Sequence, residues 1–94
     1  MAETLTDGQI QDWLTAHPQW RREQDSLVRA IQAATFPDGI QLVTRVADIA
    51  EQRNHHPDID IRWRTVTFRL STHSAGGITG ADLDLAAAID SLAA

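Results

Sequence analysis

The sequence contains no cysteine, and this absence removes several kinds of chemistry at once. Disulfides, thiolate metal sites and nucleophilic thiols all require a cysteine side chain. The chain also lacks any run of Lys or Arg that would form a basic stripe, and its formal net charge is −5 at pH 7. Such a chain repels an anionic backbone on average. We therefore expect a fold that depends on packing alone, and no nucleic-acid partner.

Long apolar stretches are missing as well. No segment approaches the length of a membrane span, and the N-terminal residues 1–8 show no basic region followed by an apolar one. We expect no membrane association and a cytoplasmic location. The 94 residues, 43% of them hydrophobic and 22% charged, are enough for one compact domain, which we assign to residues 1–94.

Three segments combine the apolar spacing of a helix with residues that begin one. Thr6 followed by Gln9, and Thr79 followed by Asp82, have the spacing of capping boxes, in which each side chain bonds the other residue's backbone N–H. Between them, an apolar stripe predicts a helix over residues 37–53, and a sheet would have to cover that face. The stripe consists of Ile40, Val43, Ala47 and Ala50, broadened by Val46 and Ile49.

Four further segments have the character of strands. Residues 20–34 predict two strands joined by a turn at residues 24–26. Alternating apolar residues then predict an antiparallel hairpin with one buried face and a turn at residues 62–64. The order α-β-β-α-β-β-α predicts an α+β domain of two layers, a four-stranded antiparallel sheet with three helices on one face. The apolar hairpin positions are Ile59, Ile61, Val66, Phe68 and Leu70.

The histidines are the residues most capable of chemistry. His55 and His56 follow the predicted end of the second helix near Asn54, with Glu51 about one turn earlier. His73 follows the last strand, in a loop that contains two glycines. If that strand pairs beside the segment carrying His55, three imidazoles converge on one cleft at a sheet edge. Imidazoles exchange protons near neutral pH, so the pattern suggests acid/base chemistry.

Other interpretations of these residues are weaker. Adjacent residues in an extended segment point to opposite sides, and no His-Glu-x-x-His motif is present, so we expect no metal ion. No Gly-x-Ser-x-Gly motif is present either, and neighbours in sequence do not build a catalytic triad. We interpret Ser71 and Thr72 as polar residues at a strand end, and His17, before a proline, as a surface residue. Spacing alone leaves the function open.

Taken together, the candidate residues resemble the signature of the pterin-4a-carbinolamine dehydratases. The resemblance extends from Trp20 through Thr44–Ala47 to Asp82, roughly three quarters of the chain. It implies a four-stranded antiparallel sheet with helices on one face, in agreement with the order of elements above. The motif residues are Glu51, His55-His56-Pro57, Trp63, Ser71-Thr72-His73, Ala75-Gly76-Gly77 and Asp82.

The resemblance also implies a reaction. Aromatic amino acid hydroxylases leave their tetrahydropterin cofactor as a 4a-hydroxy adduct, and the dehydratase removes water to give quinonoid dihydropterin. No metal and no cofactor is implied, because the pterin is the substrate. By the family pattern, His55 and His73 are the acid/base groups and His56 holds and polarises the pterin.

The remaining motif residues have alternative roles. The resemblance implies that Glu51 orients an imidazole or contacts the pterin ring, and that Asp82 binds or supports the site. Asp82 has an ordinary capping role as its alternative, and Glu51 a solvated position in the last helical turn. Trp63 fits either a pocket wall or the hairpin core, and we favour the core. Asn54 stands where some relatives carry Asp, which leaves a hydrogen bond to His55 neutral.

The open sheet edges and the family resemblance also bear on self-association and on alternative functions. A four-stranded sheet has two open edges, and the family forms dimers and tetramers, so a homodimer or homotetramer is expected. A functional link to an aromatic amino acid hydroxylase is implied as well. The alternatives are dehydration of a different pterin, and a non-catalytic dimerisation or interaction module of the same fold.

Overall fold

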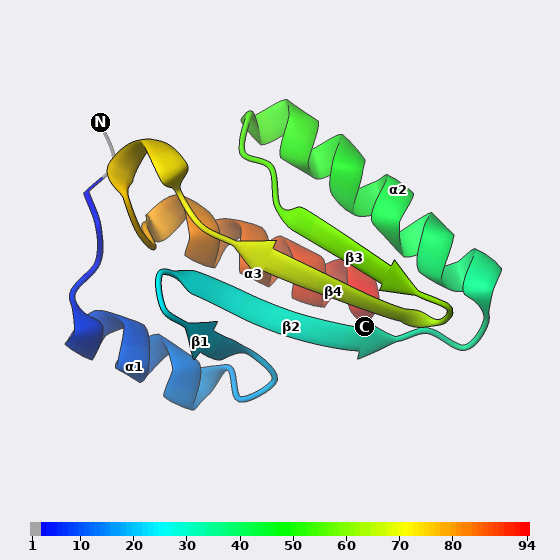
Figure 1. The fold of residues 1–94 in the computed structure, drawn as a ribbon, viewed down its shortest axis with the longest axis horizontal. Helices are drawn as coiled ribbons and strands as arrows, with labels where there is room; N and C mark the ends of the chain where they lie inside the picture. The colour runs from blue at the N-terminus through cyan, green and yellow to red at the C-terminus, as the bar shows by residue number, and fades with distance from the viewer. Residues whose placement is uncertain (1–2) are drawn as a thin grey trace.

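The computed structural model describes residues 3–94; Met1 and Ala2, on which the N-terminal prediction partly rests, lie outside the described residues. The predicted order α-β-β-α-β-β-α is confirmed, with one short 3-10 helix added before the last helix (Figure 1). The elements are α1 Asp7–Ala16, β1 Arg21–Glu23, β2 Ser26–Gln32, α2 Phe36–Arg53, β3 Asp58–Arg62, β4 Thr65–Leu70, η1 His73–Ala75 and α3 Gly80–Ala93.

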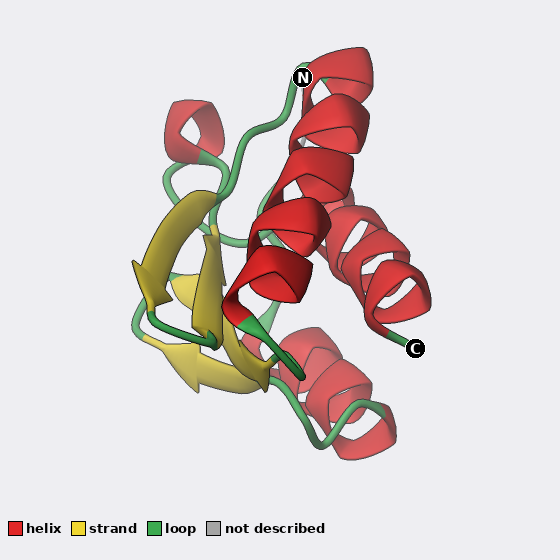
Figure 2. Cartoon of the chain, turned by 90° about the vertical axis from the view of Figure 1, so that its right-hand side faces the viewer, coloured by secondary structure: helices red, strands yellow, loops and turns green. Residues whose placement is uncertain are grey.

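The strands form one antiparallel sheet in the order β1-β2-β4-β3, and the three α-helices lie on one side of it (Figure 2). The predicted two-layer α+β fold is therefore confirmed. In the register of the hairpin, Asp58 at the start of β3 pairs with Arg69 near the end of β4. Because the strands are antiparallel, the segment that leads into β3 lies beside the loop that follows β4. The topology thus brings the histidine-bearing segments to the same end of the β3–β4 hairpin.

The helices begin at the capping residues that the sequence indicated. The Thr6 hydroxyl accepts the N–H of Gln9 at 3.1 Å, and the Gln9 side chain accepts the N–H of Thr6 at 2.9 Å. Helix α2 begins one residue before the predicted start, after Thr35, whose hydroxyl accepts the N–H of Asp38 at 3.2 Å. Side chains that satisfy the free N–H groups of a first turn define where a helix starts.

The buried face of α2 differs from the predicted stripe. The expectation that Ile40 and Ala47 face the sheet is wrong, since both side chains are exposed. The buried face runs through Gly39 instead, where a Cβ would lie 3.4 Å from the Val66 side chain, at ordinary packing distance. The helix approaches the sheet through its glycine, and Ile40 stays exposed. The buried residues of α2 are Gly39, Leu42, Val46 and Ala50.

The hairpin also departs from the prediction of one buried face. Val66 and Phe68 of β4 are fully buried, whereas their partners Ile61 and Ile59 on β3 are 39% and 36% exposed. The two isoleucines occupy the expected face, but β3 is an edge strand and no element of the described chain covers it completely. Trp63, in the turn, is 71% exposed and has φ 54°, so its assignment to the core is wrong.

A polar contact fixes α3 to the side of the sheet formed by β1 and β2. The indole N–H of Trp20 donates to Asp90 at 2.9 Å, and Arg29 of β2 pairs with the same carboxylate oxygen. Trp20 is 3% exposed, and the Arg29 and Asp90 side chains are 15% and 25% exposed. Ion pairs that are largely shielded from water hold their geometry better than exposed ones. Helix α3 is therefore fixed in place near both of its ends.

Candidate active site

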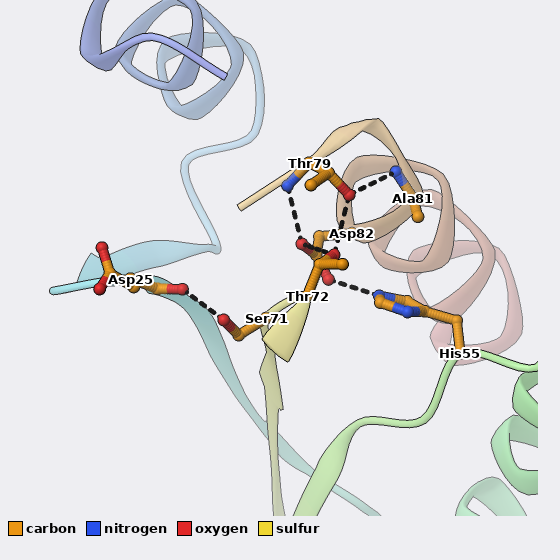
Figure 3. A network of polar contacts seen from close by, with 7 residues as sticks. All are labelled: Asp25, His55, Ser71, Thr72, Thr79, Ala81 and Asp82. Atoms are coloured by element: carbon orange, nitrogen blue, oxygen red, sulfur yellow. Dashed lines mark hydrogen bonds and ion pairs between the residues drawn. The ribbon is translucent and has the colours of Figure 1, made fainter. Parts of the chain in front are cut away.

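His55 directly follows Asn54, the C-cap of α2, and the way the helix ends sets the direction of His55. Asn54 takes a left-handed conformation with φ 50°, and the N–H of His55 donates to the Ala50 carbonyl at 3.0 Å. Asn tolerates this conformation better than most residues do. The His55 ring then turns inward, where its Nε2 lies 2.6 Å from Oδ1 of Asp82 and its side chain is only 17% exposed (Figure 3).

Asp82 is completely buried, and its carboxylate accepts from several donors. Its Oδ2 accepts the N–H of Thr79 at 2.9 Å and the hydroxyl hydrogen of Thr72 at 2.8 Å (Figure 3). Oδ1 faces His55. A buried charge is tolerated when hydrogen bonds and an opposite charge compensate for its lost hydration. The two alternatives for Asp82 therefore coincide, since one carboxylate both caps α3 and holds His55.

Thr72 is a site residue that the sequence interpretation missed. The family motif contains Thr72, but the sequence indicates no more than a polar residue at a strand end, whereas the side chain is buried and bonded to Asp82. Its neighbour Ser71 does fit that interpretation, since its hydroxyl donates to the Asp25 carbonyl in an exposed position at 2.8 Å. The position of Thr72 directly before a candidate histidine and ten residues before Asp82 was the available signal, and spacing alone could not join the residues.

The loop carrying His73 is attached to this network. His73 opens η1 and its side chain is exposed. The loop closes through the N–H of Thr72, which donates to the Gly77 carbonyl at 2.9 Å, and Gly76 takes the positive φ of 78° that the turn requires. Thr72 therefore links the His73 loop to the carboxylate that holds His55.

His56 forms a second pair, separate from the first. Its Nε2 lies 2.8 Å from Oε2 of Glu51, and the two side chains are 55% and 80% exposed. An exposed pair of this kind adds little stability, and water can replace either partner. The pair is therefore free to rearrange around a ligand.

Trp63 is not brought to these residues. It lies in the turn after β3, at the opposite end of that strand from His55 and His56. The other five candidate residues lie in two groups, and the Trp63 indole belongs to neither group. The first group is His55, Asp82 and the loop of His73; the second is His56 with Glu51.

A cleft of about 600 Å³ opens beside His55, between the end of α2 and one face of α3. Its volume falls in the range of small-molecule sites. Small side chains form most of the α3 wall, and a guanidinium and a carboxylate also line the cleft. Of the three candidate histidines, only His55 lines it. The lining residues are Arg53, His55, Ala81, Asp84, Ala87, Ala88 and Ser91.

Within residues 3–94, no group of three or more His, Asp or Glu side chains lies close enough together to hold a metal ion. The donor sets that do occur are pairs, each a histidine with one carboxylate. In such a pair the carboxylate fixes which ring nitrogen bears hydrogen and how the ring is oriented.

The chain is an α+β domain with two histidine–carboxylate pairs, one of them next to a cleft, and comparisons with known proteins identify its family. Residues 3–92 match the family model described as pterin 4 alpha carbinolamine dehydratase. The chain belongs to this family of hydro-lyases, as the sequence resemblance predicted.

Curated relatives and solved structures support the assignment. A protein of Nocardia farcinica, named provisionally as a pterin-4-alpha-carbinolamine dehydratase, is 60% identical over 91 residues, which cover 97% of this chain and 96% of that protein. A protein of Mycobacteroides abscessus with the same provisional name is 62% identical over 86 residues, covering 92% of each chain.

The solved structures extend the likeness in fold. The crystal structure of a transcriptional coactivator/pterin dehydratase from Brucella melitensis has a TM-score of 0.93 and 24% identity, covering 98% of this chain and 100% of that one. A pterin dehydratase-like protein identified as a RuBisCO assembly factor in the alpha-carboxysome has a TM-score of 0.68 and 22% identity, covering 80% and 89%. At these identities the two structures show the shared fold alone.

Proposed function

We propose that the protein dehydrates a 4a-hydroxytetrahydropterin to a quinonoid dihydropterin by histidine general acid/base catalysis. Membership of the family supports dehydration of a pterin. The observation that carries the proposed mechanism is the bond between Nε2 of His55 and the buried carboxylate of Asp82, at the edge of the cleft. This contact orients one imidazole at the site.

The proposed reaction needs two proton movements and no redox step. An acid donates a proton to the hydroxyl at C4a, the C–O bond breaks, and water leaves. A base removes the proton from the neighbouring ring nitrogen N5, whose electron pair forms the new N5=C4a double bond. The enzyme gains one proton and loses one, so it returns to its starting state without a cofactor. Groups that titrate near neutral pH can serve both steps.

We assign these roles to the three histidines. His55 and His73 are the proposed acid/base groups, in agreement with the attachment of both segments to Asp82. His56 is proposed to hold and polarise the pterin, and Glu51 to orient His56 through the bond that joins their side chains at 2.8 Å. The exposure of that pair is compatible with contact to an entering ligand.

Turnover by the purified wild-type protein tests the proposal. We expect 4a-hydroxytetrahydropterin, formed by an aromatic amino acid hydroxylase in a coupled assay, to disappear faster with the protein than without it. General acid/base catalysis typically contributes about 10²–10⁴-fold. Varying the pterin side chain in the same assay identifies the preferred substrate. We also propose that the protein acts together with an aromatic amino acid hydroxylase. A folded protein without activity would contradict the proposed dehydration and favour the interaction module.

We further propose that the protein forms a homodimer through β3. All five residues of this edge strand are exposed, including two isoleucines, and backbone groups along an uncovered edge are open to pairing. Two copies paired antiparallel about Asp60 would place each Asp58 opposite Arg62 of the partner subunit, and each Ile59 opposite the partner's Ile61. The exposed Phe36 and Ile40 of α2 add further apolar surface.

Sedimentation analysis checks this interface. We expect the wild type to sediment as a dimer and Ile61→Glu to shift the population to monomer, because the variant places a charge in an apolar strand pair. Gln52→Glu adds the same charge at an exposed position of α2 and should leave the dimer intact. A dimer that survives Ile61→Glu would place the interface elsewhere, and a tetramer would require a second one.

Residues 3–94 contain no helix that is both long and apolar enough to cross a membrane. The cytoplasmic location stays a prediction.

A further inference from the structure

A directed series of hydrogen bonds ends on Asp82. Thr72 donates its hydroxyl hydrogen to Oδ2 of Asp82 at 2.8 Å, and the hydroxyl oxygens of Thr72 and Thr79 lie 2.8 Å apart (Figure 3). A hydroxyl has one hydrogen to donate. Because the hydrogen of Thr72 goes to Asp82, the hydrogen of Thr79 must go to Thr72. The Thr79 oxygen in turn accepts the N–H of Ala81 at 3.3 Å.

An ionised Asp82 imposes this direction, because an ionised carboxylate can only accept hydrogen bonds. Its Oδ2 then receives two donors, the hydroxyl of Thr72 and the N–H of Thr79. Oδ1 is then left to accept the hydrogen of the His55 Nε2 at 2.6 Å. The neutral imidazole must hold its hydrogen on Nε2, so Nδ1 is the nitrogen that can exchange a proton.

We propose that Thr72 is a positioning residue that, through Asp82, fixes His55 in the Nε2–H tautomer and leaves Nδ1 to transfer the proton. The catalytic consequence rests on the proposed function, whereas the tautomer does not. Thr72 is 8% exposed, so water does not readily replace its hydroxyl. Without that hydrogen, Oδ2 keeps one donor, and the hydroxyl hydrogen of Thr79 loses its acceptor. The Asp82 carboxylate can then also carry a proton, and it no longer requires the hydrogen of His55 to stay on Nε2.

The test measures the tautomer directly. Two-bond ¹H–¹⁵N correlation spectra of ¹⁵N-labelled protein, recorded where His55 is neutral, distinguish a protonated ring nitrogen from an unprotonated one. We expect the Nε2–H form in the wild type and in Thr72→Ser, which keeps the hydroxyl. Thr72→Val replaces the hydroxyl by a methyl group of similar shape and should raise the Nδ1–H fraction at least several-fold. Ser71→Ala removes the neighbouring exposed hydroxyl and should leave the spectrum unchanged.

The kinetic measurement is made on the same four proteins. We expect kcat to fall on the order of tenfold in Thr72→Val with KM retained, as loss of one hydrogen bond to a charged group implies, and Thr72→Ser to restore it. A tautomer shift without wild-type turnover would support the positioning role and contradict the proposed function. An Nδ1–H tautomer in the wild type would overturn the inference even if Thr72→Val did not fold, and so would an unchanged tautomer in a folded Thr72→Val.

Discussion

Replacing His55 by alanine is expected to lower kcat by about 10²–10⁴-fold, the usual contribution of a general acid or base. The imidazole is the only candidate histidine that lines the cleft, and Asp82 fixes its Nε2. His55→Gln is the sharper variant, because its amide can still donate to Asp82 but cannot exchange a proton at neutral pH. His73→Ala should produce a loss of similar size if both residues move protons.

His17→Ala serves as the control for these measurements. This imidazole stacks on Trp13 with ring centroids 4.1 Å apart, and its Nδ1 lies 2.8 Å from the Trp13 carbonyl oxygen. Circular dichroism establishes that each variant is folded before kcat and KM are determined with the pterin substrate. If folded His55→Gln retained most of the wild-type kcat, His55 would have no role as an acid or base.

Asp82→Ala is expected to lower the free energy of unfolding by about 3–5 kcal/mol, the scale of removing one partner from a buried charged pair. The carboxylate is fully buried and accepts from His55, Thr72 and the N–H of Thr79. Without it these donors lack a partner, and α3 loses the Asp82 half of its capping box. The loss is a large share of the total stability of a small domain, so the variant should unfold at a much lower urea concentration.

Asp84→Ala is the matched control on the same helix. Asp84 is exposed, and substitutions at such positions usually change stability by less than about 0.5 kcal/mol. Urea titrations followed by circular dichroism give both values, with the slope of the transition checked for each variant. An Asp82→Ala protein as stable as Asp84→Ala would show that the network contributes nothing to folding.

Local signals predicted the fold well, because the residues that begin and end its elements act within a few positions. The capping pair Thr6 and Gln9 is complete in itself, and its bonds join residues three apart. Alternation along β4 likewise identified the buried Val66, Phe68 and Leu70. Such patterns require only the geometry of one helix or strand, so a single sequence contains all the information they need.

The sequence could not predict in the same way which side chains are buried by neighbouring helices and strands. Alternation placed Ile59 and Ile61 on the correct face, but only the arrangement of the helices decides whether that face is covered. Helix α2 shows the same limit, since its buried face includes Gly39 and leaves Ile40 exposed. The position of Trp63 depended on a two-residue turn whose backbone leaves the indole in solvent.

The sequence predicted the titratable residues of the candidate site. It did not predict the residue that supports them, Thr72. His55, His56, His73, Glu51 and Asp82 have side chains whose chemistry is evident from their identity. Thr72 has an ordinary hydroxyl, and its importance arises from a bond to a residue ten positions away, while the bond from His55 to Asp82 spans 27 positions. Distances of this kind are set by the packing of α3 against the sheet.

Helix α3 also determines when the site can form during folding. It supplies Asp82 to His55 at one end and Asp90 to Trp20 at the other, contacts that span 27 and 70 positions. Contacts between residues so far apart in sequence close large loops and are costly to form early. A chain in which the sheet and α2 have formed but α3 is undocked would leave His55 without its carboxylate partner. The orientation of this imidazole therefore depends on the docking of the last helix.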